Sequence, residues 1–370
     1  MAVSTIGTSG IADANVTTAK LAASSALVGK NLIQNGAMTL SQRGTAAGAD
    51  NHFSLDRWYW TQSSGDVCTK SQDTSVVPAG SGFKFSHKTD VTTAGGGPGA
   101  ADFNITEQRI EAQNLQHLLY GVAGAKTLVA SFWFRSPKSG THCVALYQPD
   151  ATRSYVREFT VAVADTYEYF TMTFPGDTGG TITNDTGAGL HLVFPMNVGS
   201  NFQVAANQWA AGQDYATTNQ QNLLDNTANN IYITGVQLEI GSVATDFEHE
   251  PISATLAKCK RYYERHTFDS VSGQQIAVAR IQTAASTILG FKFDVEKRVD
   301  PTFTFTAAAT FSLQYNGTTS SALAAISADH ITTTQCRIVP GLSSGLTADE
   351  AAMWQRDGTD TAYMEISAEL

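Results

Sequence analysis

The clearest alternation of apolar and polar residues in the chain lies over 231–241. Every second residue there is apolar, and the alternation shifts by one position at Thr234 and Gly235. A period of two predicts a strand with one buried face, and the shift predicts a β-bulge. The segment that follows Pro251 has the best helical pattern of the chain, over 252–264. We therefore expect this strand to close one β domain and the helix to lead into another.

Shorter alternating segments, separated by Gly, Pro, Asn and Asp, recur upstream about every ten residues. We predict a strand beginning at Leu32 and Ile33 and further strands over 53–60, 83–88, 102–111, 126–135, 142–148, 154–163, 167–174 and 189–195. Spacing of this kind is typical of antiparallel β-sandwiches. One short helix is expected over 113–120, because Gly121 is a suitable residue to end it.

A second set of alternating segments follows the helix at 252–264. We expect strands over 286–294, 301–306, 310–315, 335–339 and 362–367. Asn316 and Gly317 form a hairpin-turn signal directly after one of them. The length of this region is sufficient for a small second β domain.

Residues 1–30 are rich in Ala, Ser, Thr and Gly and contain few large apolar residues. Such a segment cannot bury enough surface alone to offset its ordering entropy. Ile6, Ile11, Val16 and Leu21 are its sparse apolar points, and their spacing suits neither a regular helix nor a single strand. The segment is either a disordered arm or, as we prefer, an arm that becomes ordered against partner chains.

The composition narrows the classes of function. Charged residues make up 15% of the 370 residues, and the formal net charge is −10. Nucleic-acid binding requires a basic face, and Lys and Arg cluster only at 258–261, so we expect no nucleic-acid partner. We find no apolar run long enough for a transmembrane helix and no signal peptide, and we expect no membrane insertion. The four cysteines are far apart in sequence and predict isolated buried thiols.

Motifs of common enzyme classes are missing from the sequence. It contains no Gly-x-Ser-x-Gly elbow and no His-Glu-x-x-His, and the glycine-rich run at 95–99 lacks the ending of a phosphate-binding loop. The segment 247–250 could offer a general acid and base, but we interpret it as a solvated connector. We therefore expect a protein that is not an enzyme.

One loop, at 175–187, could hold a metal ion. It brings Asp177, Asn184 and Asp185 close together in sequence, and oxygen ligands of this kind could hold Ca²⁺. The alternative is a polar loop in which Asn and Asp serve turn geometry. A structural Ca²⁺ ion is the one cofactor that the sequence suggests.

Aromatic residues are the candidates for sugar binding, because a ring can stack on the apolar face of a pyranose. Trp58 and Trp60 share one face of a predicted strand and Tyr59 lies on the other, and one of these faces must be core. We expect Trp133 to be buried as well. Trp209 differs, because it lies in a polar segment rich in Asn and Gln. It either anchors that segment to the core or forms a platform for a ligand. The candidate glycan-contacting residues are Trp209, Gln213, Asp214 and Tyr215.

Several motifs resemble those of bacteriophage tail-fibre and appendage proteins. They are Asn-Leu-Ile-Gln-Asn-Gly at 31–36, Asp-Arg-Trp at 56–58, Gln-Arg-Ile-Glu at 108–111, the strand at 128–135 with Gly-Thr at 140–141, the strand at 233–242, Phe-Glu at 247–248 and Cys-Lys-Arg-Tyr-Tyr at 259–263. The region 298–370 and the arm around 16–21 are also similar to such proteins. The resemblance implies a jelly roll similar to carbohydrate-binding modules, carried in a homotrimeric virion appendage.

The patterns and the resemblance together predict an all-β protein with four parts. They are an extended N-terminal attachment arm over 1–30, an antiparallel jelly-roll β-sandwich over 31–250, a connecting helix over 251–265 and a smaller C-terminal β-sandwich over 266–370. The implied protein lies on the surface of the phage particle and is assembled in the host cytoplasm. Its arm is expected to bind other virion proteins of the tail, baseplate or capsid.

The function that we expect is host adsorption, through receptor binding to host-surface polysaccharide. Two alternatives stay open. One is a purely structural capsid decoration or collar fibre that binds only virion proteins. The other is a glycan-degrading spike. The sequence does not identify the receptor.

Overall fold

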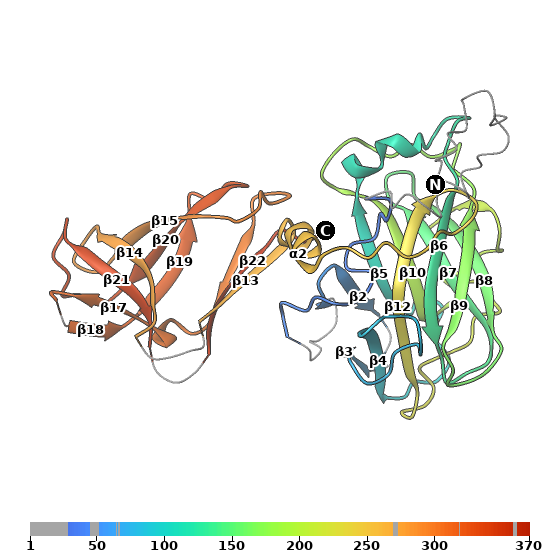
Figure 1. Ribbon diagram of the computed structural model, residues 1–370, viewed down its shortest axis with the longest axis horizontal. Coiled ribbons are helices and arrows are strands. Elements are labelled where there is room, and N and C mark those ends of the chain that lie inside the picture. The colour runs from blue at the N-terminus through green and yellow to red at the C-terminus, as the bar shows by residue number, and fades with distance from the viewer. Residues whose placement is uncertain are drawn as a thin grey trace, which may run out of the picture. The chain divides into compact units, whose positions relative to one another are not determined.

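The computed structural model describes residues 29–44, 52–63, 65, 67–268, 273–317, 319–357 and 361–370. The predicted arm therefore lies, apart from its last two residues, outside the described residues. The chain forms two compact units, Met1–Pro251 and Ile252–Leu370, which we call the N-terminal unit and the C-terminal unit. In Figure 1 the first unit is coloured from blue to yellow and the second from orange to red. No helix of the described residues is long and apolar enough to cross a membrane.

Two antiparallel sheets form the N-terminal unit (Figure 1). The order of strands in sheet A is β1 (His52–Leu55), β2 (Trp58–Gln62), β5 (Phe103–Glu111), β10 (Ala188–Val198), β7 (Gly140–Gln148), β8 (Arg153–Val161) and β11 (Trp209–Ala211). The order in sheet B is β3 (Val67–Asp73), β4 (Ser86–Thr93), β12 (Asn230–Ile240), β6 (Leu128–Arg135) and β9 (Glu168–Phe174). Strands far apart in the chain pair as neighbours, as β5 does with β10 and β4 with β12. The unit is the predicted antiparallel jelly-roll β-sandwich.

The core of this unit contains many aromatic rings. Phe132 of β6 contacts Phe194 of β10 edge-on, with ring centroids 5.0 Å apart, and Phe159 of β8 at 5.3 Å. Trp58 and Trp60 of β2 are buried in the same cluster. Burying an apolar side chain of this size contributes about 1.5–3 kcal/mol. The core face of β2 is therefore the one that carries Trp58 and Trp60, and the core face of β6 is the one that carries Phe132.

The predicted bulge is present in β12. The pairing of β12 with β6 shifts in register between Thr234 and Gln237. Gly235 lies at the shift with φ +60°, a conformation that few residues other than glycine adopt. A Cβ atom at this position would lie 2.6 Å from the ring of Phe83. Glycine is therefore required here both by the backbone and by the ring above it.

The segment 31–36 runs beside this bulge but is not a strand, which corrects the prediction for Leu32 and Ile33. The backbone N–H of Leu32 donates to the carbonyl of Leu238 (2.8 Å). The side chain of Asn31 accepts from the N–H of Leu238 (3.0 Å) and donates to the carbonyl of Val236 (3.2 Å). Side-chain bonds thus replace part of the ladder that a regular strand would form.

Two further pairs of contacts hold the same segment. The carbonyl of Gly36 accepts from the N–H of Val236 (3.0 Å), and a Cβ at Gly36 would lie 2.0 Å from the Val236 oxygen. Gln34 and Gln108 of β5 exchange two bonds, from Gln34 N to Gln108 Oε1 (2.6 Å) and from Gln108 Nε2 to Gln34 O (2.8 Å). Segment 31–36 therefore connects sheet B to sheet A.

Three other elements of this unit differ from the prediction. The strand expected over 53–60 is a hairpin of β1 and β2, because Asp56 and Arg57 form a turn in which Arg57 has φ +71°. The expected helix is a 3₁₀ helix, η2 (Ala112–Leu118), and the left-handed residue at its end is Leu119. Strands β3 and β11 were not predicted.

The C-terminal unit begins with helix α2 (Ile252–Lys260), which ends four residues earlier than predicted. Its small sheet has the order β13 (Tyr263–Phe268), β22 (Ala362–Ser367) and β16 (Thr302–Phe305). Its large sheet has the order β18 (Thr319–Ala322), β17 (Phe311–Tyr315), β21 (Ala351–Arg356), β14 (Gln275–Ile281), β15 (Thr287–Lys292), β20 (Gln335–Gly341) and β19 (Ala325–Asp329). The two sheets share a core that includes Trp354 and Met364. Asn316 and Gly317 both have positive φ between β17 and β18, which confirms the predicted turn.

The C-terminal unit contains a buried ion pair between Glu264 of β13 and Lys297. The ammonium group of Lys297 is 2.6 Å from Glu264 Oε2, and both side chains are fully buried. His266 Nε2 lies 2.8 Å from the other carboxylate oxygen. Burial alone would raise the pKa of Glu264, but bonds and charges from His266 and Lys297 outweigh it and lower the pKa to about 2. Glu264 has His266 and Lys260 as further partners, but without Glu264 the buried ammonium group of Lys297 would keep only its bond to the backbone carbonyl of Lys260.

We predict that this pair makes the C-terminal unit sensitive to acid. The pKa of Glu264 is about 2 in the folded chain and 4.5 as the ordinary value. Its stabilisation is therefore complete above pH 4.5 and is lost as the pH falls from 4.5 towards 2. Glu264→Gln should lower the free energy of unfolding at pH 7 by about 3 kcal/mol or more, because Lys297 then stays buried and unpaired. Hydrogen exchange of the β13 and β22 amides measures this free energy for the unit itself.

Asp329→Asn is the matched control. The pKa of Asp329 is also lowered to about 2, mainly by its hydrogen bonds with Arg337, but its side chain is 43% exposed. Exposed pairs contribute little to stability, so this variant should leave the exchange rates nearly unchanged. Equal effects of the two substitutions would contradict the assignment.

Candidate functional site

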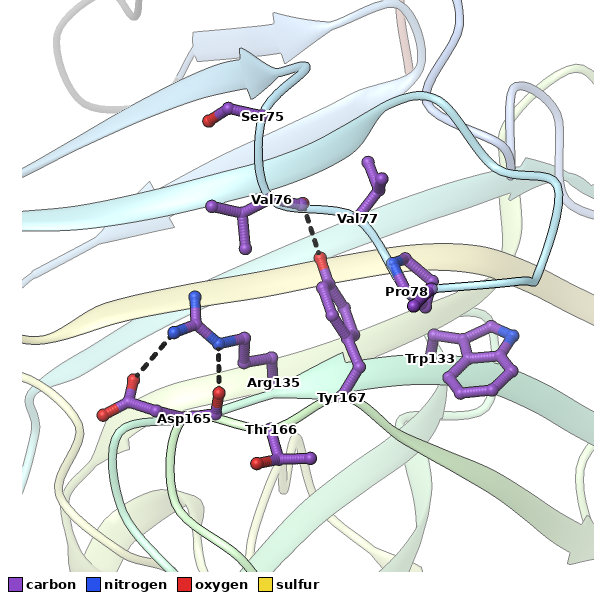
Figure 2. Close-up of a pocket in the computed structure, with 10 residues that line it drawn as sticks. Ser75, Val76, Val77, Pro78, Trp133, Arg135, Asp165, Thr166 and Tyr167 are labelled. Atoms are coloured by element: carbon purple, nitrogen blue, oxygen red, sulfur yellow. Dashed lines mark hydrogen bonds and ion pairs between the residues drawn. The ribbon is translucent and has the colours of Figure 1, made fainter.

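A pocket lies on the outer face of sheet B, away from the core. Because side chains alternate along β6, Phe132 and Phe134 face inward while Trp133 and Arg135 face outward. These two outward side chains line a pocket of ≈ 480 Å³. Its walls come from the loop after β3, at 75–79, and from the loop before β9, at 165–167 (Figure 2). The site therefore combines one central strand with two loops that are distant in sequence.

Hydrogen bonds hold the two walls together. Asp73, the last residue of β3, accepts the N–H groups of Ser75 (2.8 Å) and Val76 (2.7 Å) and so fixes the turn into the first wall. From the second wall, the Tyr167 hydroxyl donates to the Val76 carbonyl (3.2 Å), as Figure 2 shows. Burial raises the pKa of Tyr167, so its hydroxyl stays a neutral donor. The pocket thus has a defined shape.

One end of the pocket carries a charged pair. Arg135 donates from Nε to the backbone carbonyl of Asp165 (2.7 Å) and from its terminal nitrogen to the Asp165 carboxylate (3.2 Å). The guanidinium group also lies over the ring of Tyr232, 5.1 Å from its centroid. The side chain of Arg135 is 21% exposed and that of Asp165 is 61% exposed. This end offers hydrogen-bond donors and acceptors together, with a net charge of zero.

The other end is aromatic and apolar. Figure 2 shows the ring of Trp133 below Pro78, at the end of the pocket opposite to the charged pair. Trp133 is half-buried, not buried as the sequence suggested. The alternation along β6 already placed it opposite Phe132, but only the structure shows that this outer face remains partly open. Tyr169 of β9 pairs with Trp133 across the strands, with ring centroids 5.3 Å apart, and is 47% exposed.

The lining of this pocket offers groups that could bind a ligand. One carboxylate, that of Asp165, lines it, whereas hydrolysis of a glycosidic bond generally requires two. Apolar wall residues and a tryptophan ring face polar groups that both donate and accept. Such a surface fits a ligand with apolar faces and a rim of hydroxyl groups.

Trp209, the leading candidate from the sequence, lies at the edge of sheet A. It pairs with Tyr155 of β8 and so points to the core side of the sheet. Its ring packs edge-on against Tyr155 (5.5 Å) and Tyr120 (5.8 Å), and its Nε1 donates to the carbonyl of Pro175 (2.7 Å). This geometry is that of an anchor for the loop.

The three other predicted contact residues lie on the outer side of sheet A, away from Trp209. Tyr215 is 2% exposed and stacks on Phe202, with centroids 5.7 Å apart, so its ring has no open face. Gln213 is exposed and donates to the Tyr215 hydroxyl. The N–H of Asp214 donates to Ser154 Oγ (2.8 Å). Contact of these residues with a glycan stays a prediction.

A charged cluster that the sequence did not indicate lies beside Tyr215. Glu107 of β5 is 1% exposed and accepts from Arg109 Nε (2.8 Å), while His191 Nδ1 is 2.8 Å from its other oxygen. The Arg109 guanidinium covers the ring of Tyr59 at 4.0 Å. Burial alone would raise the pKa of Glu107, but His191 and Arg109 together lower it. Glu107 is therefore an ionised structural partner of these two side chains.

The predicted metal ligands do not form a site that fits calcium. Asp177 is buried, and its carboxylate accepts from Arg153 Nε (2.6 Å) and from the N–H of Gly179 (2.9 Å). Asp185 accepts from the N–H of its own turn, and Asn184 is exposed. The described residues include no group of three or more His, Cys, Asp or Glu side chains that could hold a metal. Arg153 already supplies the positive charge at Asp177, so structural Ca²⁺ stays a prediction without support from this geometry.

The four cysteines are free thiols, and all are buried. This confirms the prediction from their spacing. Burial raises the pKa of Cys143 and raises that of Cys336 to about 12. Thiols of this kind are unreactive at neutral pH.

The chain is similar to several solved structures. It matches no protein-family model and no curated protein. Among solved structures it is similar to the enzymatically active domain of tailspike protein 4 of bacteriophage CBA120, at 14% identity and a TM-score of 0.31 over 57% of this chain and 22% of that one. A CBM4 structure matches at 16% identity and a TM-score of 0.31, over 56% and 99% of the two chains. A family 11 carbohydrate-binding module from Clostridium thermocellum, in complex with a mixed-linked tetrasaccharide, matches at 11% identity and a TM-score of 0.27, over 54% and 98%.

The chain thus spans about a fifth of the tailspike chain that it matches. Likenesses of this size do not bear on the ligand or on the reaction.

We predict that Trp209 stabilises the N-terminal unit without contacting the ligand. Trp209→Ala should lower the free energy of unfolding by about 2–3 kcal/mol, less than for a fully buried tryptophan. Trp209→Phe should lose about 1 kcal/mol, because the ring contacts remain while the bond to Pro175 is lost. Hydrogen exchange of the β8 and β11 amides measures both losses. Loss of glycan binding by a Trp209→Ala protein of unchanged stability would show instead that Trp209 is a ligand platform.

Proposed function

We propose that this protein is a non-catalytic component of a phage tail fibre or related appendage, and that the outer face of sheet B binds host-surface glycan. The observation that carries the glycan proposal is the pocket itself. It places the Trp133 ring at one end and the Arg135–Asp165 pair at the other, in a volume of ≈ 480 Å³. Pockets of about 300–1,000 Å³ are typical of small-molecule sites.

Each end of the pocket suits one aspect of a sugar. Aromatic rings present broad apolar area with little conformational entropy to lose. Paired charged groups can accept and donate bonds to hydroxyls, which themselves do both. Binding in such a site is reversible, and several copies on one particle raise the avidity without any new contact.

The virion role is supported by the resemblance of the motifs and by the all-β architecture. In this proposal the protein is located on the phage particle surface, and the arm at 1–30 attaches it to other virion proteins. A homotrimer would present three pockets. The arm lies outside the described residues, so it contributes nothing to the argument for the pocket.

We expect a solution mass of three chains. Sedimentation equilibrium or light scattering of the full chain measures it directly. A trimer is the expected result, because the resemblance to phage tail-fibre proteins implies one; the repeated sites would then raise the avidity. A stable monomer over the whole concentration range would contradict the trimer and would leave the pocket to be judged by binding alone.

One alternative function has a specific observation in its favour. Several residues that carry the phage-protein resemblance, among them Asn31, Gln34 and Gln108, bond the scaffold together. A purely structural decoration or collar fibre would need only this scaffold. A glycan-degrading spike has no such support, since one carboxylate lines the pocket.

A glycan array with the full chain separates these functions. Wild-type protein should bind at least one bacterial surface polysaccharide, and Asp165→Ala should weaken that binding about tenfold, which corresponds to about 1.4 kcal/mol. The physical reason is that the substitution removes an acceptor and one of the two bonds between Arg135 and Asp165, while the bond to the Asp165 backbone carbonyl remains. Stability should fall only modestly, because the Asp165 side chain is mostly exposed, although its φ of +57° is less favourable for Ala than for Asp.

Asp349→Ala is the matched control for this experiment. Asp349 also forms an exposed pair, with Arg280 at 2.9 Å, but it lies in the C-terminal unit. Its loss should leave glycan binding unchanged. Absence of binding by the wild type would favour the purely structural role, and release of reducing ends from a bound polysaccharide would favour the spike.

A further inference from the structure

The residues around Trp133 determine in which direction the pocket is open to a longer ligand. Towards β12 its cross-strand partner is Thr234, which is fully buried and donates to the carbonyl of Phe85 (2.7 Å). The ring of Phe83 covers Gly235 in the same direction. A ligand that lies on Trp133 therefore cannot extend across β12.

Two other directions are also bounded by side chains. Along β6 towards its start, the outward residues Ser131 and Val129 are 3% and 1% exposed. Along β6 towards its end, Arg135, Asp165 and Tyr167 line the pocket, and Figure 2 shows the Tyr167 ring between Trp133 and the Arg135–Asp165 pair. Side chains therefore bound the pocket in these three directions.

The remaining side leads over Tyr169. This residue is the cross-strand neighbour of Trp133 on β9, the edge strand of sheet B. Its ring is 47% exposed, lies 5.3 Å from the Trp133 ring and does not line the pocket. It is thus a second ring surface directly outside the opening.

The charges around the site select against acidic ligands. The two charged residues of the lining are Arg135 and Asp165, which neutralise each other. Lys88 and Asp90 of β4 form another pair on the same face of sheet B, at 3.5 Å. The chain as a whole carries a net charge of −10, which repels polyanions at long range.

We propose that the pocket receives the terminal residue of a neutral oligosaccharide, and that the next residue stacks on Tyr169. This inference rests on the proposed function, since it names the class of glycan that the site takes. The pocket subsite supplies hydrogen bonds and the Trp133 ring. The Tyr169 subsite supplies a ring surface on a residue that is about half exposed, and it accommodates further chain beyond it.

The test is the dependence of affinity on chain length. The probes are neutral oligomers of glucose, galactose, mannose and xylose with one, two and four residues, together with oligogalacturonates as acidic probes, titrated into the full chain by calorimetry. For the neutral series that binds, affinity should rise about tenfold from one residue to two and change little from two to four. Oligogalacturonates should bind at least about tenfold more weakly than neutral oligomers of equal length.

Variants assign the gain to Tyr169. Tyr169→Ala should remove the rise between one and two residues, whereas Tyr169→Phe should keep it, because the stacking surface is retained. Val163→Ala is the control: Val163 is 57% exposed in the loop before β9 and does not line the pocket, and its loss should change nothing.

The outcomes that overturn the inference differ from the one that overturns the proposed function. Equal affinity for one and two residues, tighter binding of oligogalacturonates, or a chain-length gain that survives in Tyr169→Ala would each overturn the inference while glycan binding stands. If no neutral or acidic sugar binds the wild type, the proposed function fails and the inference fails with it.

Discussion

The structure of the N-terminal unit depends on how the segment 31–36 is bonded to the bulged strand β12. A regular strand would satisfy its neighbour through a backbone ladder, but the bulge at Gly235 interrupts the ladder there. The side chain of Asn31 and the carbonyl of Gly36 supply the missing partners. Buried backbone groups left unpaired would each cost about 1–3 kcal/mol. The arrangement therefore requires Asn31 and Gly36 opposite a strand that lies about two hundred positions away in the chain.

This constraint reaches the candidate site through Gly235. The absence of a side chain there leaves room for Phe83 and for the edge of Trp133, whose Cδ1 atom would lie 3.1 Å from a Cβ at this position. The bulge thus determines where the tryptophan ring rests and which side of it is covered. Scaffold and pocket share one strand, β6, whose inward residues fill the core while its outward residues line the site. A substitution at the bulge would therefore change the position of Trp133 in the pocket, although Gly235 itself does not line the pocket.

The motif residues that resemble phage proteins and the loop residues at the pocket have different roles in this chain. The motif residues Asn31, Gln108 and Gly36 are explained by bonds within the fold, so the resemblance that they carry concerns the scaffold. Of the residues that line the pocket, Trp133 and Arg135 lie in the motif strand at 128–135, whereas Asp165 lies in none of the motifs that resemble phage proteins. Tyr169, beside the pocket, also lies outside these motifs. A shared jelly roll can therefore accompany different ligands, because the loops at 75–79 and 165–167 shape the site independently of the motifs.

The sequence by itself determined the secondary structure of the strongly periodic segments and which residues of β2, β6 and β12 share a face, because alternation and turn residues act over a few neighbours. It also located the bulge at Gly235 and the turn at Asn316 and Gly317. It could not place Leu32, whose partner Leu238 is far away in the chain, nor divide 53–60 into two strands at Arg57. Only the tertiary structure decided that Trp133 remains partly open while Tyr215 is buried, because the loops that cover or spare an outer face come from other parts of the chain. Alternation assigns a side chain to a face, but it does not state what lies above that face.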